Sequence, residues 1–263
     1  MADPLLVVED IAKSYAPAGR RSGSAPMRAR PALDAVSFAL DRGDILGIVG
    51  ESGSGKSTLA RCITLLEHPD RGRVVFDGAD LTALDARALR RMRRQVQIVF
   101  QDPYSSLNPR MAVGDALAEV LYVHRLVVAD AIASRVGQLL EMVGLPPTAA
   151  TQYPADLSGG QRQRVCIARA LAAEPRLLIA DEAVSALDVS IQAQILNLLL
   201  DLQRDLGLAL IFISHNLYVV RRIARRIGVM FGGRLIEMIP EGMPLDNAQH
   251  PYTQALLAAA PRV

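Results

Sequence analysis

The stretch that organises this chain is Gly50-Glu51-Ser52-Gly53-Ser54-Gly55-Lys56-Ser57-Thr58, which follows an apolar run at 45–49 and precedes a helix-like segment at 59–66. Because glycines carry no Cβ, successive backbone N–H groups can curl around a phosphate. The helix that follows adds unpaired N–H groups and the positive end of its dipole. The order of strand, glycine loop and helix predicts a site for the phosphates of a nucleotide.

Two side chains in this loop are suited to phosphate chemistry. Lys56 is expected to reach the outer phosphates and the Ser57 hydroxyl to bind Mg²⁺. The chain has 29 Lys and Arg residues, yet only Lys13 and Lys56 are lysine. A planar guanidinium cannot replace a compact ammonium in a tight phosphate cradle. A lysine at this position therefore indicates a chemical role rather than a structural one. The alternative is a glycine-rich turn with a surface lysine.

Composition limits the class of protein. The 263 residues suffice for one core, and 51% hydrophobic with 21% charged residues is typical of a soluble globular chain. The net charge of +2 argues against a large surface that binds nucleic acid. No apolar run approaches the roughly 18 residues of a membrane span, and the N-terminus does not resemble a signal peptide. Cys62 and Cys166 are expected to be buried, reduced thiols.

Apolar patterning predicts an alternation of strands and helices. Residues 16–31 have loop composition with four arginines, and a surface excursion is favoured over a membrane or partner contact. A mostly helical lobe is expected at about 105–155, inserted into an α/β core. Strands are expected at 6–11, 36–40, 45–49, 74–76 (an edge strand), 97–100, 177–180, 208–214, 229–231 and 235–237, and helices at 85–94 (with a solvated basic face), 161–173, from a cap at Ser190, 217–224 and 251–259.

Polar residues follow several of these strands. In an open α/β sheet, ligands bind beyond the carboxyl ends of the strands. The phosphate loop follows the strand at 45–49, Gln101 the strand at 97–100, Asp181 and Glu182 the strand at 177–180, and His215 the strand at 208–214. We therefore expect four segments to converge on one nucleotide.

Each of these residues has a role that its chemistry permits. Asp181 can hold Mg²⁺, and Glu182, pointing the other way, can polarise the attacking water. His215 can contact the γ-phosphate, and Gln101 can bind Mg²⁺ or orient water. Tyr15 can stack on adenine, since aromatic stacking on a base contributes roughly 1–3 kcal/mol. The structural alternatives are a solvated turn at 181–182, a structural histidine and an edge-loop tyrosine.

A second glycine turn, Ser158-Gly159-Gly160, begins another predicted helix and offers a hydroxyl and bare N–H groups. One nucleotide does not need two such cradles from one chain. If the second cradle lies in the helical lobe, it can serve a nucleotide that a neighbouring chain holds. Two chains facing head-to-tail would then enclose two ATP molecules.

With these motifs in place, the sequence resembles the nucleotide-binding domain of ATP-binding-cassette (ABC) transporters along essentially its whole length. Residues 50–58 resemble the Walker A motif, Gln101 the Q-loop glutamine, and 177–182 the Walker B motif with its catalytic glutamate. Leu157-Ser158-Gly159-Gly160-Gln161 spells the LSGGQ signature, Ser185-Ala186-Leu187-Asp188 resembles the D-loop, His215 the switch histidine and Tyr15 the adenine-stacking residue.

The resemblance implies a P-loop NTPase fold of the ABC ATPase type. This fold has a mixed central sheet with helices, an N-terminal antiparallel β subdomain and an inserted helical subdomain. Residues 1–263 would form one domain. Its helical insert would occupy about 105–155 and extend to 173, and a C-terminal extension would occupy 240–263. It also implies ATP and Mg²⁺ as ligands, with Ser158, Gly159, Gly160, Gln161 and Asp188 among the nucleotide-binding residues.

Within the family, the sequence is similar to the ATPase subunits of dipeptide, oligopeptide and nickel importers at residues 100–109, 186–194 and 250–257. Tyr104 with Asn108-Pro109 is more similar to the second of the two ATPase subunits that such importers often use. Two positions depart from the family pattern, because Ala183 replaces a common proline and Asn216 a common aspartate. Neither is expected to abolish the site.

The resemblance therefore implies an ATPase that energises peptide import at the cytoplasmic face of the inner membrane. Nickel, glutathione or opines are alternative cargoes, and an export ATPase or a non-transport ABC ATPase are alternative classes. The implied partners are a second ABC ATPase subunit, two transmembrane permease subunits and, indirectly, an extracytoplasmic solute-binding protein. No nucleic-acid partner is implied. Motion would pass to the permease through the groove near Gln101, 102–110 and 150–156.

Overall fold

The computed structural model describes residues 3–15, 31–185 and 187–259, so the expected excursion at 16–31 lies almost wholly outside the described residues. Two compact units are present. Unit 1 comprises residues 1–85 and 213–263, and unit 2 comprises residues 86–212. The units are described separately below.

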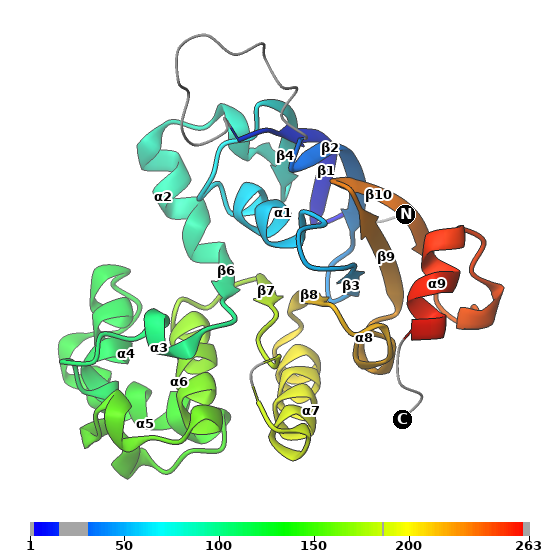
Figure 1. The fold of residues 1–263 in the computed structure, drawn as a ribbon. Coiled ribbons are helices and arrows are strands. Elements are labelled where there is room, and N and C mark those ends of the chain that lie inside the picture. The colour runs from blue at the N-terminus through cyan, green and yellow to red at the C-terminus, as the bar shows by residue number, and fades with distance from the viewer. Residues whose placement is uncertain (1–2, 16–30, 186, 260–263) are drawn as a thin grey trace, which may run out of the picture. The chain divides into compact units, whose positions relative to one another are not determined.

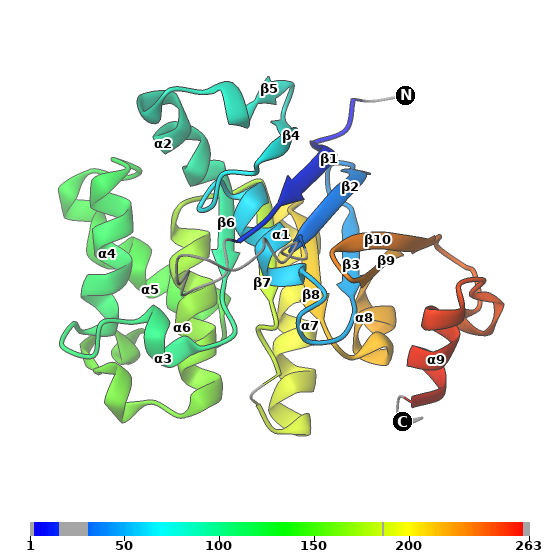
Figure 2. The ribbon, with the colours of Figure 1, turned by 45° about the horizontal axis from the view of Figure 1, so that its top comes forward.

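Unit 1 contains an antiparallel sheet with the strand order β2-β1-β4-β5 (Figure 2). Its strands are β1 (Leu6–Lys13), β2 (Leu33–Leu40), β4 (Arg71–Phe76) and β5 (Ala79–Asp80). The N-terminal antiparallel β subdomain expected from the sequence is thus present. The expectation that residues 74–76 form an edge strand is wrong, because the two-residue strand β5 pairs with β4 on its outer side.

A second set of strands in unit 1 carries the phosphate loop (Figure 1). Strand β3 runs parallel to β9, and β9 pairs with β10 in an antiparallel hairpin. The bounds in this set are β3 (Ile45–Val49), α1 (Lys56–Ile63), α8 (Leu217–Ile223), β9 (Arg226–Phe231), β10 (Arg234–Ile239) and α9 (Pro251–Ala259). All five residues of β3 are buried, as the continuous apolar run predicts.

An ion pair ties β9 to the chain that enters β3. The guanidinium of Arg226 donates to Oδ2 of Asp44 from Nη2 at 2.9 Å and from Nε at 3.3 Å, and Nη2 also donates to the carbonyl of Ala39 at 3.1 Å. Both side chains are partly buried. This fork joins segments far apart in the sequence and fixes the strand that delivers the phosphate loop.

Unit 2 combines parallel strands with helices. Strand β6 (Val96–Val99) pairs in parallel with β7 (Leu177–Asp181), and β8 (Ala209–Ser214) lies on the other side of β7. Every residue of β7 and β8 is buried. With the antiparallel hairpin in unit 1, the described strands include both pairings, as the predicted mixed sheet requires.

Helices make up the rest of unit 2. Their apolar stripes face one another, with Leu117 of α4, Leu139 of α5 and Ile167 of α6 fully buried. The bounds are α2 (Ala86–Gln95), α3 (Pro103–Ser106), α4 (Val113–Val123), α5 (Ile132–Met142), α6 (Gly159–Ala172) and α7 (Val189–Leu206). The helical segment expected at about 105–155 and onward to 173 therefore holds α3 to α6.

The structure tests the expected helix cap at Ser190 and the expected burial of the two cysteines. Ser190 does not cap a helix, because α7 begins at Val189 and its N-cap residue is Asp188. Cys62 and Cys166 are both free and buried, as expected, and burial raises the pKa of their thiols to about 11 and about 12. Among the described residues, no helix has the length and apolar character that crossing a bilayer requires.

Close packing of α8 on β3 gives a stability prediction. A Cβ built on Gly47 would lie 2.0 Å from Cγ1 of Val220 and 2.9 Å from Cβ of Ala224. We expect Gly47→Ala to lower the free energy of unfolding by about 1–3 kcal/mol, because the helix must shift outward. Chemical denaturation measures this change.

Gly137→Ala is the matched control. This glycine lies inside α5, and its added Cβ would be 3.7 Å from Pro147, an ordinary contact. We expect Gly137→Ala to raise stability by about 0.5–1 kcal/mol through helix propensity. A Gly47→Ala variant as stable as the wild type would contradict the packing of α8 against β3.

Candidate functional site

The turn between β3 and α1 forms an open cradle in unit 1. Helix α1 begins at Lys56, and its N-cap residue Gly55 has φ 104° and no side chain to cap the first turn. The N-cap residue therefore gives the first N–H groups of the helix no side-chain acceptor. An anion is the natural partner for such a helix end.

Glycine is required at both ends of this loop. A Cβ on Gly50 would lie 2.2 Å from the carbonyl oxygen of Met230, and one on Gly55 would lie 2.3 Å from that of Ala32. Both positions are thus close approaches between backbones, and Gly55 also has a left-handed φ. These contacts shape the predicted cradle at Gly50, Glu51, Ser52, Gly53, Ser54, Gly55, Lys56, Ser57 and Thr58.

Lys56 is the buried cation of the loop, with 4% of its surface exposed. Its ammonium donates to the carbonyls of Gly50 and Glu51, each at 2.8 Å, and lies 3.5 Å from Oγ of Ser54. Burying an ammonium is costly unless acceptors surround it. Charged phosphate oxygens are stronger acceptors for an ammonium than neutral carbonyls are.

Tyr15 is half-exposed in unit 1, at the end of β1. Its hydroxyl donates to Glu67, and the ammonium of Lys13 lies 6.0 Å from the centre of its ring. Burial and the Glu67 hydrogen bond raise the pKa of this phenol. The stacking of Tyr15 on adenine stays a prediction.

His215 is exposed and directly follows β8. The next residue, Asn216, caps α8, because its Oδ1 accepts from the N–H groups of Tyr218 at 3.0 Å and Val219 at 3.3 Å. Asparagine and aspartate are both good N-caps, so the departure from the family pattern at 216 preserves this local structure. The cap fixes the backbone immediately after His215.

In unit 2, two carboxylates end β7. Asp181 is 5% exposed, and Glu182 has a left-handed backbone with φ 49°. A non-glycine residue in this region carries strain of about 1–3 kcal/mol, which a fold tolerates where the side chain must be aimed. The division of roles between Asp181 and Glu182 stays a prediction.

Gln101 is joined to Glu182 through Ser185. The amide of Gln101 donates to Oγ of Ser185 at 3.1 Å, and that hydroxyl donates to the carbonyl of Glu182 at 2.9 Å. The backbone N–H of Ser185 donates to the same carbonyl at 3.0 Å. The residue after β6 and the residue after β7 are therefore linked by hydrogen bonds, a connection that the motifs alone did not indicate.

The signature residues begin α6 in a capping box. Oγ of Ser158 accepts from the N–H of Gln161 at 3.3 Å, and Oε1 of Gln161 accepts from the N–H of Ser158 at 2.9 Å. Helix capping alone thus gives Ser158 and Gln161 a structural role. The Ser158 hydroxyl remains able to donate its own proton to a phosphate.

The glycines of the signature lie against the start of α7. A Cβ on Gly160 would lie 2.7 Å from Cγ2 of Ile191, and one on Gly159 would lie 3.5 Å from Leu187. Asp188 is exposed and makes no capping bond to α7, and Val189 is 80% exposed. Unit 2 thus presents the signature and residues 187–189 together on its surface.

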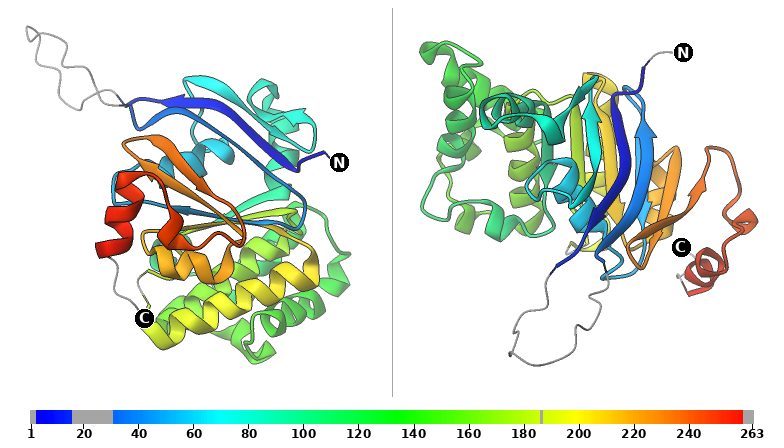
Figure 3. Two further views of the ribbon diagram at one scale, coloured as in Figure 1. Left: turned by 90° about the vertical axis from the view of Figure 1, so that its right-hand side faces the viewer. Right: turned by 90° about the horizontal axis from the view of Figure 1, so that it is seen from above.

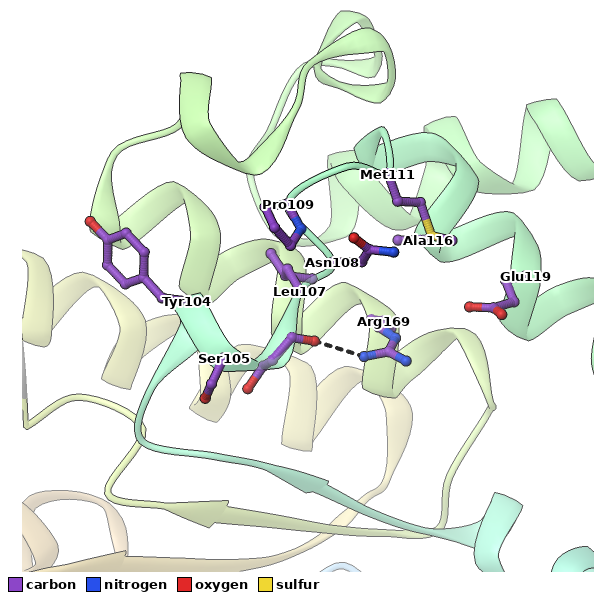
Figure 4. A pocket seen from close by; sticks show the side chains of 10 residues that line it. Tyr104, Ser105, Leu107, Asn108, Pro109, Met111, Ala116, Glu119 and Arg169 are labelled. Carbon is purple, nitrogen blue, oxygen red and sulfur yellow. Dashed lines mark hydrogen bonds between the residues drawn. The ribbon is translucent and has the colours of Figure 1, made fainter.

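A hollow of about 520 Å³ lies elsewhere in unit 2, beside α3 and the chain after it (Figure 4). Arg169 of α6 donates to the carbonyl of Ser106 at 2.9 Å and fixes one wall. Tyr104, on the rim, is 66% exposed, and the guanidinium carbon of Arg162 lies 4.1 Å from the centre of its ring. Tyr104, Ser105, Ser106, Leu107, Asn108, Pro109, Met111, Ala116, Glu119 and Arg169 line the hollow.

The predicted site residues fall into two groups. Unit 1 holds the phosphate loop, Tyr15 and His215, and unit 2 holds Gln101, Asp181, Glu182, the signature and Asp188. The oxygen donors of Ser57, Gln101 and Asp181 form a set that Mg²⁺ accepts. Within the described residues, no cluster of three or more His, Cys, Asp or Glu side chains with metal-binding geometry is present.

Comparisons with known proteins identify the family. The ABC transporter family model matches residues 33–185, more than half of the chain. Glutathione import ATP-binding proteins GsiA from Salmonella paratyphi A and from Escherichia coli K12 are each 53% identical to the chain over 230 residues. These residues cover 88% of this chain and 37% of the relatives, so the chain spans little more than a third of their length.

Solved structures agree with this match. The dimeric post-hydrolysis state of the ATP-binding cassette MJ0796, bound to ADP and Pi, has a TM-score of 0.75 and 29% identity, covering 89% of this chain and 97% of that one. CbiO1 from Clostridium perfringens, part of the ABC transporter complex cbiONQ, has a TM-score of 0.77 and 27% identity, covering 98% and 92%. The resemblance drawn from the motifs is confirmed, and the chain belongs to the ABC transporter family with the fold of its ATP-binding cassettes.

Proposed function

We propose that this chain is an ATP-hydrolysing subunit that energises an ABC importer for peptides. The observation that carries the proposal is the cradle of unit 1, in which an uncapped helix end at Gly55 meets the buried ammonium of Lys56. Both features favour a polyphosphate. Walker A residues 50–58 would hold the phosphates, and Tyr15 would stack on the adenine.

The hydrolytic roles follow from the chemistry of each side chain. Ser57, Gln101 and Asp181 would hold Mg²⁺, which neutralises charge on the phosphate oxygens. Glu182 would accept a proton from the attacking water, and His215 would contact the γ-phosphate. The hydrogen bonds from Gln101 through Ser185 to Glu182 support this assignment, because they couple the glutamine to the backbone that aims the carboxylate.

A second ATPase subunit would complete the site. Ser158, Gly159, Gly160 and Gln161 would face the γ-phosphate held by the partner, and Asp188 would lie at the same interface. The surface of unit 2 supports this view, since the exposed residues Asp188 and Val189 lie in the sequence between Leu187 and Ile191, which pack near the signature glycines. The partner would be either a copy of this chain or a distinct ABC ATPase subunit.

The hollow beside α3 would receive a segment of a transmembrane permease. It lies at residues 104–111, the stretch from which the sequence predicts coupling to the membrane. Two permease subunits would hold the ATPase pair at the cytoplasmic face of the inner membrane, and an extracytoplasmic binding protein would deliver the solute.

The proposed cargo is a small peptide. Similarity to proteins named for glutathione import favours small peptides, because glutathione is itself a tripeptide. Nickel and opines are the other cargoes that the importer resemblance allows.

Replacing Lys56 tests nucleotide binding. We expect Lys56→Ala to weaken ATP binding at least about 100-fold in titration calorimetry, because the charge-assisted contacts to phosphate are lost. Lys13→Ala is the control, since Lys13 pairs with Asp70 at the surface. Wild-type affinity in Lys56→Ala would remove Lys56 from the site.

Replacing Glu182 separates binding from hydrolysis. Glu182→Gln keeps the shape of the side chain and removes its basicity, so ATP binding should persist while kcat falls about 10²- to 10⁴-fold. Glu174→Gln is the control, because Glu174 also has a positive φ (52°) in unit 2 but pairs with Arg94 and Arg135. Near wild-type turnover in Glu182→Gln would exclude Glu182 as the base.

Replacing Gly159 tests the shared site. Gly159→Asp places a negative charge at the start of α6, where the helix tolerates it but a phosphate would be repelled. We expect unchanged ATP binding by the isolated chain and loss of ATP-dependent association and hydrolysis, measured by light scattering and phosphate release.

Gly159→Ala is the matched uncharged variant, and it should keep most of the activity because its Cβ meets only Leu187 at 3.5 Å. If Gly159→Asp abolished ATP binding by the isolated chain, the signature would not serve a partner's nucleotide.

A further inference from the structure

The C-terminal helix contacts the phosphate loop through one hydroxyl. Tyr252 lies in the first turn of α9, and its Oη accepts a hydrogen bond from the backbone N–H of Glu51 at 3.1 Å. Its ring packs on Phe231, the last residue of β9, with the ring centroids 4.3 Å apart and the planes tilted by 37°. Figure 3 shows α9, in red, beside the β9–β10 hairpin. Residues 201 positions apart in the sequence thus meet in unit 1.

The start of α9 is itself fixed to the hairpin. The carboxylate of Glu237 on β10 accepts from the N–H of Gln249 at 2.6 Å and from the N–H of His250 at 3.3 Å. Burial opposes the charge of Glu237, but the nearby Thr253 hydroxyl and the hydrogen bonds from these two amides outweigh it and lower the pKa of the carboxyl. Nδ1 of His250 then accepts from the N–H of Tyr252 at 3.1 Å.

The same hairpin also supports the phosphate loop directly. The N–H of Gly233, in the turn after β9, donates to the carbonyl of Ser54 at 3.1 Å. The carbonyl of Met230 lies so close to Gly50 that no Cβ fits between them. The phosphate loop and the start of α9 therefore rest on one β-hairpin, and Tyr252 connects them.

Glu51 is held from both sides of its backbone. Its carbonyl accepts from the ammonium of Lys56 at 2.8 Å and from the N–H of Ser54 at 3.1 Å, while its N–H donates to Tyr252. A bound phosphate would compete with the Glu51 carbonyl for the Lys56 ammonium. The bond to Tyr252 does not depend on that ammonium, so it would persist when the lysine turns toward the phosphate.

We propose that Tyr252 is a positioning residue for the phosphate loop, and that residues 249–259 act as a brace that keeps the entrance of the loop in its binding shape. The proposal rests on the proposed function, in which this loop takes the phosphates of ATP. A loop that is already ordered loses less entropy when it binds, and its affinity is correspondingly higher. Tyr252 contacts the loop backbone rather than the reacting atoms.

Tyr252→Phe removes only the hydroxyl and keeps the ring on Phe231. We expect MgATP to bind the full chain about 3- to 10-fold more weakly in titration calorimetry, in keeping with one lost neutral hydrogen bond. KM for ATP should rise by a similar factor while kcat stays within about twofold, since uniform binding is affected. Tyr122→Phe is the matched control, because Tyr122 is 72% exposed on α4 of unit 2.

Hydrogen exchange of the Glu51 amide supplies a readout that needs no nucleotide. In the nucleotide-free chain, this amide should exchange several-fold faster in Tyr252→Phe than in the wild type, with the thermal midpoint unchanged. A variant with wild-type affinity and wild-type exchange at Glu51 would overturn the proposal. So would a variant that melts earlier yet binds MgATP normally, because Tyr252 would then serve only the packing of α9.

The two proposals fail in different ways. If wild-type chain bound no MgATP, the proposed function would be wrong, and the exchange rate of the Glu51 amide would still decide whether Tyr252 holds the loop. If the wild type bound MgATP and Tyr252→Phe matched it in affinity and exchange, only the brace would be refuted.

Discussion

The phosphate loop of unit 1 is built around one buried ammonium, that of Lys56. Lys56 lies among backbone carbonyls that carry partial charges only, within a loop whose glycines allow the backbone to close around it. The carbonyls keep the cation in place, and burying an ammonium is costly unless acceptors of this kind surround it. The strand β3, the glycine turn and the helix α1 together hold this ammonium in the loop that we propose binds phosphate.

Much of the fold could be predicted from the sequence because buried strands have a plain signature. The apolar runs at 45–49 and 177–180 correspond to β3 and to most of β7, and the final helix has the expected bounds at 251–259. The errors occur where the signal is short or local. Strand β5 has only two residues and no apolar pattern, so its pairing with β4 could not be expected. Ser190 has the chemistry of a cap, but the chain turns into the helix two residues earlier, at Asp188.

The site shows the same division between local motifs and long-range contacts. The phosphate loop, the carboxylates after β7 and the signature were recognisable because each is contiguous in the sequence. The hydrogen bonds of Gln101 with Ser185 and of Glu51 with Tyr252 join residues 84 and 201 positions apart, and no spacing rule specifies such partners. The positive φ of Glu182 is also invisible in a sequence, because glutamate seldom adopts it. Tyr252 did belong to a stretch similar to the importer family, and that similarity was the available clue to its importance.

The scarcity of lysine gives the protein a practical chemical handle. Reagents that acylate primary amines have two side-chain targets, Lys13 and Lys56, in the whole sequence. Lys13 lies at the surface beside Asp70, whereas Lys56 is almost fully enclosed by its loop. Acylation of Lys56 therefore requires the loop to open. The ratio of its acylation rate to that of Lys13 in the same molecule would measure how often the phosphate loop opens, with Lys13 as the internal reference.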